Sequence, residues 1–233
     1  MNDRVIKPEA TERTKIIFQE ACSVENMDAK LGRTLEEEEN AIRRFILSQT
    51  PVLGRIPAID EIKEAFNHIS AENVNAILIK LDQLDVIHLD EDRSAIAAAY
   101  PFSGTETSHV ITLKKDGQER LHAMCAIDAL GISFMLERDT VIESKCYHCE
   151  DRVEIEISNG EIVILKPETA VVWCDMEYSC NAATSLCKNI NFFSSGHHFA
   201  EWQEKRPRRN GHLLSMEEAF YLGKLFFENR LNS

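Results

Sequence analysis

The segment from Met124 to Leu136 places a thiol and a carboxylate three residues apart in a mostly apolar run. If this run is a helix, Cys125 and Asp128 share one face. The apolar neighbours predict burial, and a buried face rarely holds an unpaired carboxylate. At the helix start, the partial positive charge of the N-terminus would favour the Cys125 thiolate. The pair is therefore either a nucleophile or soft-metal ligand beside an acid, or an inert core thiol beside an aspartate that accepts backbone hydrogen bonds.

Four further cysteines have spacings that suggest a metal site. Cys146 and Cys149 are spaced as in tetrahedral zinc sites, and Cys174 and Cys180 could complete a four-thiolate structural zinc site. Five residues separate the second pair instead of two, so the zinc site is one alternative. A redox dithiol at the first pair is weaker, because no helix start follows to lower a thiol pKa.

Two other features attract attention. Cys187 precedes the apolar, strand-like run 190–193, and by itself it would be a packed core thiol. His197 and His198 follow Gly196 and are expected in an exposed loop, with a role as metal ligands the less favoured interpretation.

The overall charge limits the classes of partner. The 233 residues include 26 Lys and Arg against 39 Asp and Glu, a net charge of −13, which makes DNA an unexpected partner. The basic stretch 205–209 is expected to be a solvated loop. No apolar run is long enough for a membrane span, and the polar start is unlike a signal peptide. Seven cysteines, an odd number, indicate free thiols or metal ligands in the reducing cytoplasm.

The first half is predicted to be helical. Residues 1–34 are polar and are expected to form a loosely attached arm with some helix around residues 12–22. Apolar stripes predict helices over 36–47, 58–66 and 71–84, the first of them broken by Pro51, Gly54 and Pro57. Strand-like runs follow, and three helices before strands is the order of a winged helix-turn-helix. The candidate recognition helix offers only Lys80 as a cation, which favours a scaffold over DNA binding.

The second half is predicted to be mainly antiparallel sheet with flanking helices. Branched residues at 108–114 and 139–144 indicate strands, and the clearest hairpin turns at Asn159-Gly160. The expected fold class is α+β. We predict three parts, namely a polar N-terminal arm over 1–34, a winged-helix-like helical domain over 35–104, and the sheet domain, which would carry the chemistry, over 105–233.

Three motifs, taken in order, resemble the alkylmercury (organomercurial) lyase family. They are LHAMCAIDAL at 121–130, SKC at 144–146, and SLCKNINFFSS at 185–195 followed by Glu201-Trp202. Order and approximate spacing agree with the family over about 108–225. The capping box Ser215–Glu218 also fits the family's C-terminal helix. The three-helix region is similar to the family's winged-helix-like domain with lower specificity. The specific feature is the set of Cys125, Asp128 and Cys187.

The resemblance implies an enzyme of mercury detoxification and resistance that splits a carbon–mercury bond by protonolysis, giving a hydrocarbon and Hg(II). Cys125 and Cys187 would bind the soft metal as thiolates, and Asp128 would deliver a proton to the leaving carbon. No organic cofactor is implied. The Hg(II) product would stay on the thiolates until a small thiol or a mercuric reductase accepted it. We expect an apolar wall that holds the organic group and raises the pKa of Asp128, formed by Ile127, Leu130, Phe134, Phe192 and Phe193.

The sequence also departs from the family pattern. Lys188 stands where some members have a second cysteine, and Cys149, Cys174 and Cys180 are additional. The alternative is a non-catalytic protein on the same scaffold that binds or senses metal through thiolates, with the winged-helix-like half in a regulatory role. A sensor needs only the thiolates, whereas a lyase also needs the acid of Asp128.

Overall fold

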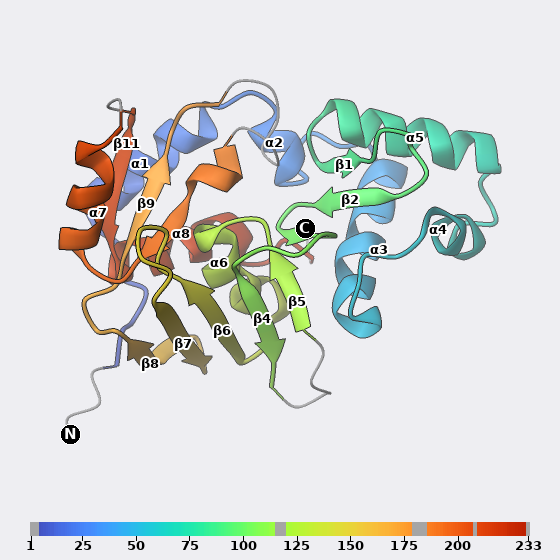
Figure 1. Ribbon diagram of the computed structural model, residues 1–233. Coiled ribbons are helices and arrows are strands. Elements are labelled where there is room, and N and C mark those ends of the chain that lie inside the picture. The colour runs from blue at the N-terminus through green and yellow to red at the C-terminus, as the bar shows by residue number, and fades with distance from the viewer. Residues whose placement is uncertain (1–4, 115–119, 179–185, 207–208, 232–233) are drawn as a thin grey trace.

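The computed structural model describes residues 5–114, 120–178, 186–206 and 209–231. Cys180, Ser185 and part of the basic stretch 205–209 lie outside these ranges. Figure 1 shows a sheet and its helices forming the larger part of the molecule, with a group of three helices at one end. These three are α3 (Glu37–Leu53), α4 (Ile59–Ala65) and α5 (Ala71–Gln83). No helix of the described ranges is both long and apolar enough to cross a membrane.

An antiparallel sheet of eight strands organises the chain, in the order β1-β2-β3-β5-β4-β6-β7-β8. Its strands are β1 (Ile87–Leu89), β2 (Ile96–Ala99), β3 (Phe102–Ser103), β4 (Val110–Leu113), β5 (Arg120–Ala123), β6 (Thr140–Lys145), β7 (Arg152–Ser158) and β8 (Glu161–Lys166). The strands predicted at 108–114 and 139–144 and the hairpin at Asn159-Gly160 are confirmed. The α+β fold class is therefore as predicted.

A smaller sheet lies beside the large one, in the order β10-β9-β11. Its strands are β9 (Val171–Asp175), β10 (Asn191–Phe193) and β11 (Gly211–Ser215), and α7 (Gly196–Glu204) and α8 (Met216–Phe227) follow β10 and β11 in the chain. On β9, Trp173 joins a small aromatic cluster with Phe199 and Trp202 of α7, while Cys174 belongs to the main core. Successive side chains of a strand point to opposite faces, so this sheet separates two environments.

The helix α6 (Ala126–Leu136) is buried because it is apolar on nearly all sides. It packs against α8 at unusually close range. A Cβ atom added to Gly131 would lie 2.0 Å from Cδ2 of Phe227. Glycine is therefore required where the two helices touch, and this contact fixes the position of the helix that begins at Cys125.

The helix predicted around residues 12–22 is confirmed, but the N-terminal arm is not loosely attached, so that part of the prediction was wrong. The helices α1 (Glu12–Cys22) and α2 (Met27–Lys30) pack on the second half of the chain, with Ile17 and Leu31 buried in the main core. The rings of Phe18 and Phe226 lie 4.9 Å apart. The apolar residues of this segment are few, but each is placed to fill the core, which a low average hydropathy conceals.

Two other expectations concern the first half. Of the residues predicted to break the first helix, Pro51 does not, because α3 includes it in its last turn; the helix ends before Gly54, which has φ of 67°, as predicted. A proline there removes only one helical hydrogen bond. Three helices followed by the β1–β2 hairpin match the predicted order. Strand β3, which precedes the predicted domain boundary between residues 104 and 105, pairs with β5, which follows it. The large sheet therefore contains strands from both sides of that boundary. The division into domains and the winged-helix comparison stay predictions.

Candidate active site

Two short backbone segments bring Cys125, Asp128 and Cys187 together. Cys125 is the N-cap of α6, and its Sγ accepts a hydrogen bond from the backbone N–H of Asp128 at 3.4 Å. Cys187 begins the 3₁₀ turn Cys187–Asn189 just before β10, and its thiol donates to Oδ2 of Asp128 at 3.8 Å. A ligand atom of each residue lies within 4.8 Å of the others. Side chains 62 residues apart in sequence thus form one buried group, with exposures of 2%, 1% and 3%.

Burial controls the protonation of this group. It raises the pKa of Asp128 to about 7, although hydrogen bonds from both thiols and the charge of Lys30 act in the opposite direction. Burial also raises the pKa of Cys125 well above its ordinary value. The hydrogen bond with Cys125 lowers the pKa of Cys187, but burial and Asp128 raise it more. The prediction that the helix start favours the Cys125 thiolate was therefore wrong, because desolvation of the charged form outweighs the helix dipole.

A small apolar cavity of about 40 Å³ lies against the three residues. Its wall includes Tyr100, Ile127, Leu186, Ile190 and Phe226. Of the predicted wall, only Ile127 lines the cavity. The other four predicted wall residues do not line the cavity. They pack in the main core or, for Phe193, in the small aromatic cluster; the other three are Leu130, Phe134 and Phe192. The wall thus comes largely from residues distant in sequence.

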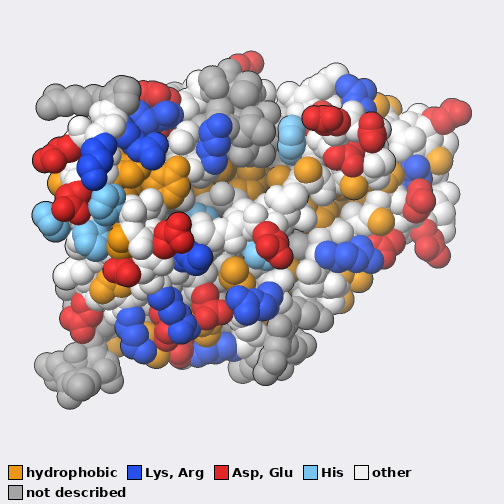
Figure 2. All heavy atoms as spheres, viewed as in Figure 1, with side chains coloured by type: hydrophobic (Ala, Val, Ile, Leu, Met, Phe, Trp, Pro, Cys, Tyr) orange, Lys and Arg blue, Asp and Glu red, His pale blue; other side chains and the backbone are white. Residues whose placement is uncertain are grey.

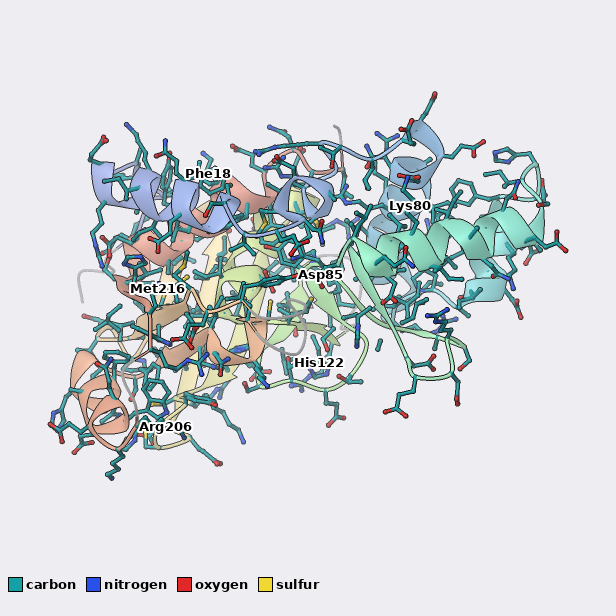
Figure 3. All side chains as sticks on the ribbon, turned by 90° about the horizontal axis from the view of Figure 1, so that it is seen from above. Phe18, Lys80, Asp85, His122, Arg206 and Met216 are labelled. Atoms are coloured by element: carbon teal, nitrogen blue, oxygen red, sulfur yellow. The ribbon has the colours of Figure 1, made fainter. Side chains whose placement is uncertain are left out.

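A buried ion pair adjoins the cavity. Lys30, which lines the cavity, forms an ion pair with Asp85, and both side chains are buried. The hydroxyl of Tyr178 donates to Oδ2 of Asp85 at 2.9 Å, and Nζ of Lys30 lies 4.9 Å from the centre of the Tyr178 ring. Figure 3 shows Asp85 near the middle of the molecule, close to the end of α5. Sequence reasoning missed this group, because a lysine in a polar segment and an aspartate after a helix carry no local signal of burial.

The remaining thiols divide between two places. Cys174 lines the cavity beside Cys125 and Cys187, and burial raises its pKa to about 12. Cys146 and Cys149 instead form a group with His198. The prediction that Cys174 joins Cys146 and Cys149 in a zinc site was wrong. Side chains alternate along β9, so Trp173 faces the cluster that contains Cys146 and Cys174 faces the cavity on the other side. Cys180 lies outside the described residues.

The histidine expectation also needs correction. His197 and His198 lie in the first turn of α7 rather than in a loop. Nδ1 of His198 is 3.3 Å from Sγ of Cys149 and 3.7 Å from Sγ of Cys146. Burial alone would raise the pKa of Cys146. Hydrogen bonds from the side chain and backbone of Ser194 and from the backbone of the turn outweigh burial and lower this pKa to about 6.

Comparison with known proteins gives consistent matches. Residues 102–228 match the family model for alkylmercury lyase. An alkylmercury lyase of Bacillus cereus is 31% identical over 149 residues, which cover 62% of this chain and 64% of that relative. One of Staphylococcus epidermidis is 25% identical over 206 residues, 87% of this chain and 90% of the relative. The crystal structure of the mercury-bound form of MerB2 superposes with a TM-score of 0.72 at 25% identity, covering 94% of this chain and all of that one.

Two buried thiols that share a carboxylic acid form the kind of site that suits a thiophilic metal and the transfer of a proton beside it. With the family model matched over more than half of its length, the chain belongs to the alkylmercury lyase family. Its alignment spans a little under two thirds of the Bacillus cereus relative.

Proposed function

We propose that the protein is an organomercurial lyase that cleaves a carbon–mercury bond by protonolysis. The observation that carries the proposal is the Asp128 carboxyl, which has a pKa of about 7 and lies in contact with both thiols. An acid of near-neutral pKa can both accept a proton from a thiol and donate it again at neutral pH. An inert core thiol would not need such a neighbour.

The reaction follows from the protons in this group. A cation R–Hg⁺ and two thiols give R–H, Hg(II) bound to two thiolates, and one released H⁺. Cys125 and Cys187 start as thiols, because burial raises the pKa of each. Mercury binding takes their protons off, since the metal ligand is the thiolate. Asp128 accepts one of these protons and passes it to the carbon as the carbon–mercury bond breaks.

The surroundings suit an apolar substrate and a soft product. The cavity wall beside the thiols is apolar, so it fits an alkyl or aryl group better than a hydrated ion. Hg(II) then stays on the two sulfurs until a competing thiol, either a small molecule or a mercuric reductase, removes it. DNA is not proposed as a partner, because Lys80, the one cation of α5, pairs with Glu39.

Benzene release from phenylmercury under anaerobic, reducing conditions tests the proposal. We expect Cys125→Ser and Cys187→Ser to lower turnover by about 10³-fold or more, the scale seen when one member of a catalytic unit is lost. Asp128→Asn should keep mercurial binding but lose turnover by about 10²- to 10⁴-fold. Cys22→Ser, a thiol outside both clusters, is the matched control and should behave as wild type.

The alternative, a metal-binding or metal-sensing protein, predicts a different result. The wild type would then bind phenylmercury tightly and release no benzene, and Asp128→Asn would change nothing. That outcome would remove the lyase proposal, because the thiols would serve capture alone.

A further inference from the structure

A second group of metal-binding side chains lies outside the candidate active site. It comprises Cys146, Cys149 and His198, whose ligand atoms all lie within 4.8 Å of one another. Cys146 is buried, Cys149 is exposed and His198 is half-buried. Figure 2 shows histidine side chains gathered on the surface at the end of the molecule where α7 lies in Figure 1. The proposed lyase reaction uses none of these residues.

The distances match those of a tetrahedral site. Zn–S bonds of about 2.3 Å and Zn–N bonds of about 2.05 Å at tetrahedral angles place nitrogen and sulfur about 3.6 Å apart. The two observed distances from Nδ1 of His198 are 3.3 Å to Cys149 and 3.7 Å to Cys146. Small side-chain rotations are therefore enough to bring all three atoms onto one ion.

The backbone holds these residues in place without a metal. Cys146 begins a tight turn in which its N–H donates to the carbonyl of Asp151 at 2.8 Å and its carbonyl accepts from Glu150 at 2.9 Å. Tyr147, within the turn, donates to the carbonyl of Phe192 in β10. On the other side, Ser195 caps α7 by accepting from the N–H of His198. The ligands thus come from two fixed elements about 50 residues apart in sequence.

We propose that Cys146, Cys149 and His198 bind Zn²⁺ in a tetrahedral site with one open position. Two thiolates and one imidazole are a ligand set that zinc prefers, and the imidazole distinguishes the site from the all-thiol groups that softer ions select. The described residues offer three ligands in the group, and the exposed Cys149 leaves solvent access for a water molecule as the fourth. The hydroxyl of Ser194 lies 2.6 Å from Nδ1 of His198, the nitrogen that faces both thiols, so a bound ion would replace this hydrogen bond.

The ion would join the turn after β6 to α7. These elements enclose a separate aromatic cluster of Trp173, Phe193, Phe199 and Trp202, into which Cys146 also packs. The cluster is small and lies apart from the main core, so a metal crosslink at its edge would stabilise it as it does in other small metal-bound units. The inference is independent of the lyase activity.

Cobalt substitution tests the site directly. We would titrate Co²⁺ into reduced, metal-free protein carrying Cys125→Ser and Cys187→Ser, so that the candidate active site contributes no thiolate. One equivalent of Co²⁺ should give the intense sulfur-to-cobalt charge-transfer band and the visible bands of a tetrahedral ion, and one equivalent of Zn²⁺ should displace it.

Variants assign the ligands. Cys149→Ser and His198→Ala should each weaken Zn²⁺ binding at least about 100-fold, since even loss of an outer hydrogen bond costs 10- to 100-fold. These two are used because Cys146 is buried and its replacement can unfold the cluster. His197→Ala is the matched control, because this neighbouring histidine is 77% exposed and pairs with Glu201 instead. It should bind as the parent does.

Three results would overturn the proposal. They are the absence of a tetrahedral cobalt spectrum, a spectrum unchanged by Cys149→Ser and His198→Ala, and binding of Hg(II) but not of Zn²⁺ at this cluster.

Discussion

The two thiol groups of this protein use the same side chain in opposite surroundings. Cys125 and Cys187 are both buried in the main core with a carboxylic acid between them, whereas the buried Cys146 is joined by an exposed Cys149 and a half-buried imidazole. Burial keeps the first pair protonated, so that protons are available when a metal binds. The second pair shares an imidazole instead of a buried carboxylic acid, and two thiolates with an imidazole are a set of ligands that suits lasting coordination of zinc.

The small sheet keeps the two groups apart. On β9, the side chain of Trp173 belongs to the aromatic cluster that contains Cys146, while the next residue, Cys174, lines the cavity beside Cys125. A shift of one residue along this strand would exchange the two faces. The pairing register of β9 therefore decides that Trp173 faces the aromatic cluster and Cys174 faces the cavity.

The largest expected effect comes from Asp128 in the buried group, which should make the free energy of unfolding depend on pH. Asp128 has a pKa of about 7 in the folded protein against an ordinary value of 3.8, so the folded state holds an extra proton between these values. Its contribution to stability is complete at low pH and is lost as pH rises towards 7. Between pH 4.5 and 7.5 we expect the wild type to lose about 3 kcal/mol relative to Asp128→Asn.

Urea unfolding of both proteins at several pH values measures this difference. The comparison uses the change with pH rather than the absolute stability, which removes the constant cost of the substitution. A difference that stays flat across this range would show that Asp128 titrates normally, and the contrast between the two groups would then lose its electrostatic basis.

The sequence was sufficient for the part of the site that depends on local spacing and on the family motifs. Cys125 and Asp128 lie one turn apart on a helix that its apolar pattern predicts, and motif order supplied Cys187. The hairpin at Asn159-Gly160 was predicted for the same local reason. Features that depend on tertiary packing were not predictable from one sequence.

Lys30 and Cys174 illustrate that limit. Lys30 lies in a segment of low hydropathy, yet its side chain is buried against Asp85. Cys174 has zinc-like spacing with Cys180 but faces the cavity because of its strand register. His198 becomes a candidate ligand only because Ser195 starts a helix there. Burial, register and the meeting of distant turns decided each case.

A second prediction concerns the support of the buried group. Gly131→Ala should destabilise the protein by about 1–3 kcal/mol, because the added methyl would meet Phe227 and force α6 away from α8. Gly196→Ala is the matched control on α7, since nothing lies within 4 Å of its added Cβ. It should change stability by less than about 0.5 kcal/mol. Equal effects in urea unfolding would contradict the close contact of α6 and α8.

The smallest expected effect concerns the second thiol group, whose His198 lies in the first turn of α7. Ser195→Ala removes the cap of α7 and should cost about 1 kcal/mol of stability. Because the same hydroxyl holds the N–H of His198, the substitution should also weaken Co²⁺ binding several-fold. Ser215→Ala removes the equivalent cap of α8, at a similar cost, but Ser215 has no contact with the cluster of Cys146, Cys149 and His198 among the described hydrogen bonds.

The pair of cap variants separates positioning from general destabilisation. If Ser195→Ala weakens Co²⁺ binding and Ser215→Ala does not, the helix cap holds the imidazole for the metal. If both variants weaken binding equally, loss of stability alone explains the effect, and the first turn of α7 has no special part in the second site. Cobalt titration and urea unfolding of the same preparations distinguish the two results, because one measures the ligand group and the other the whole fold.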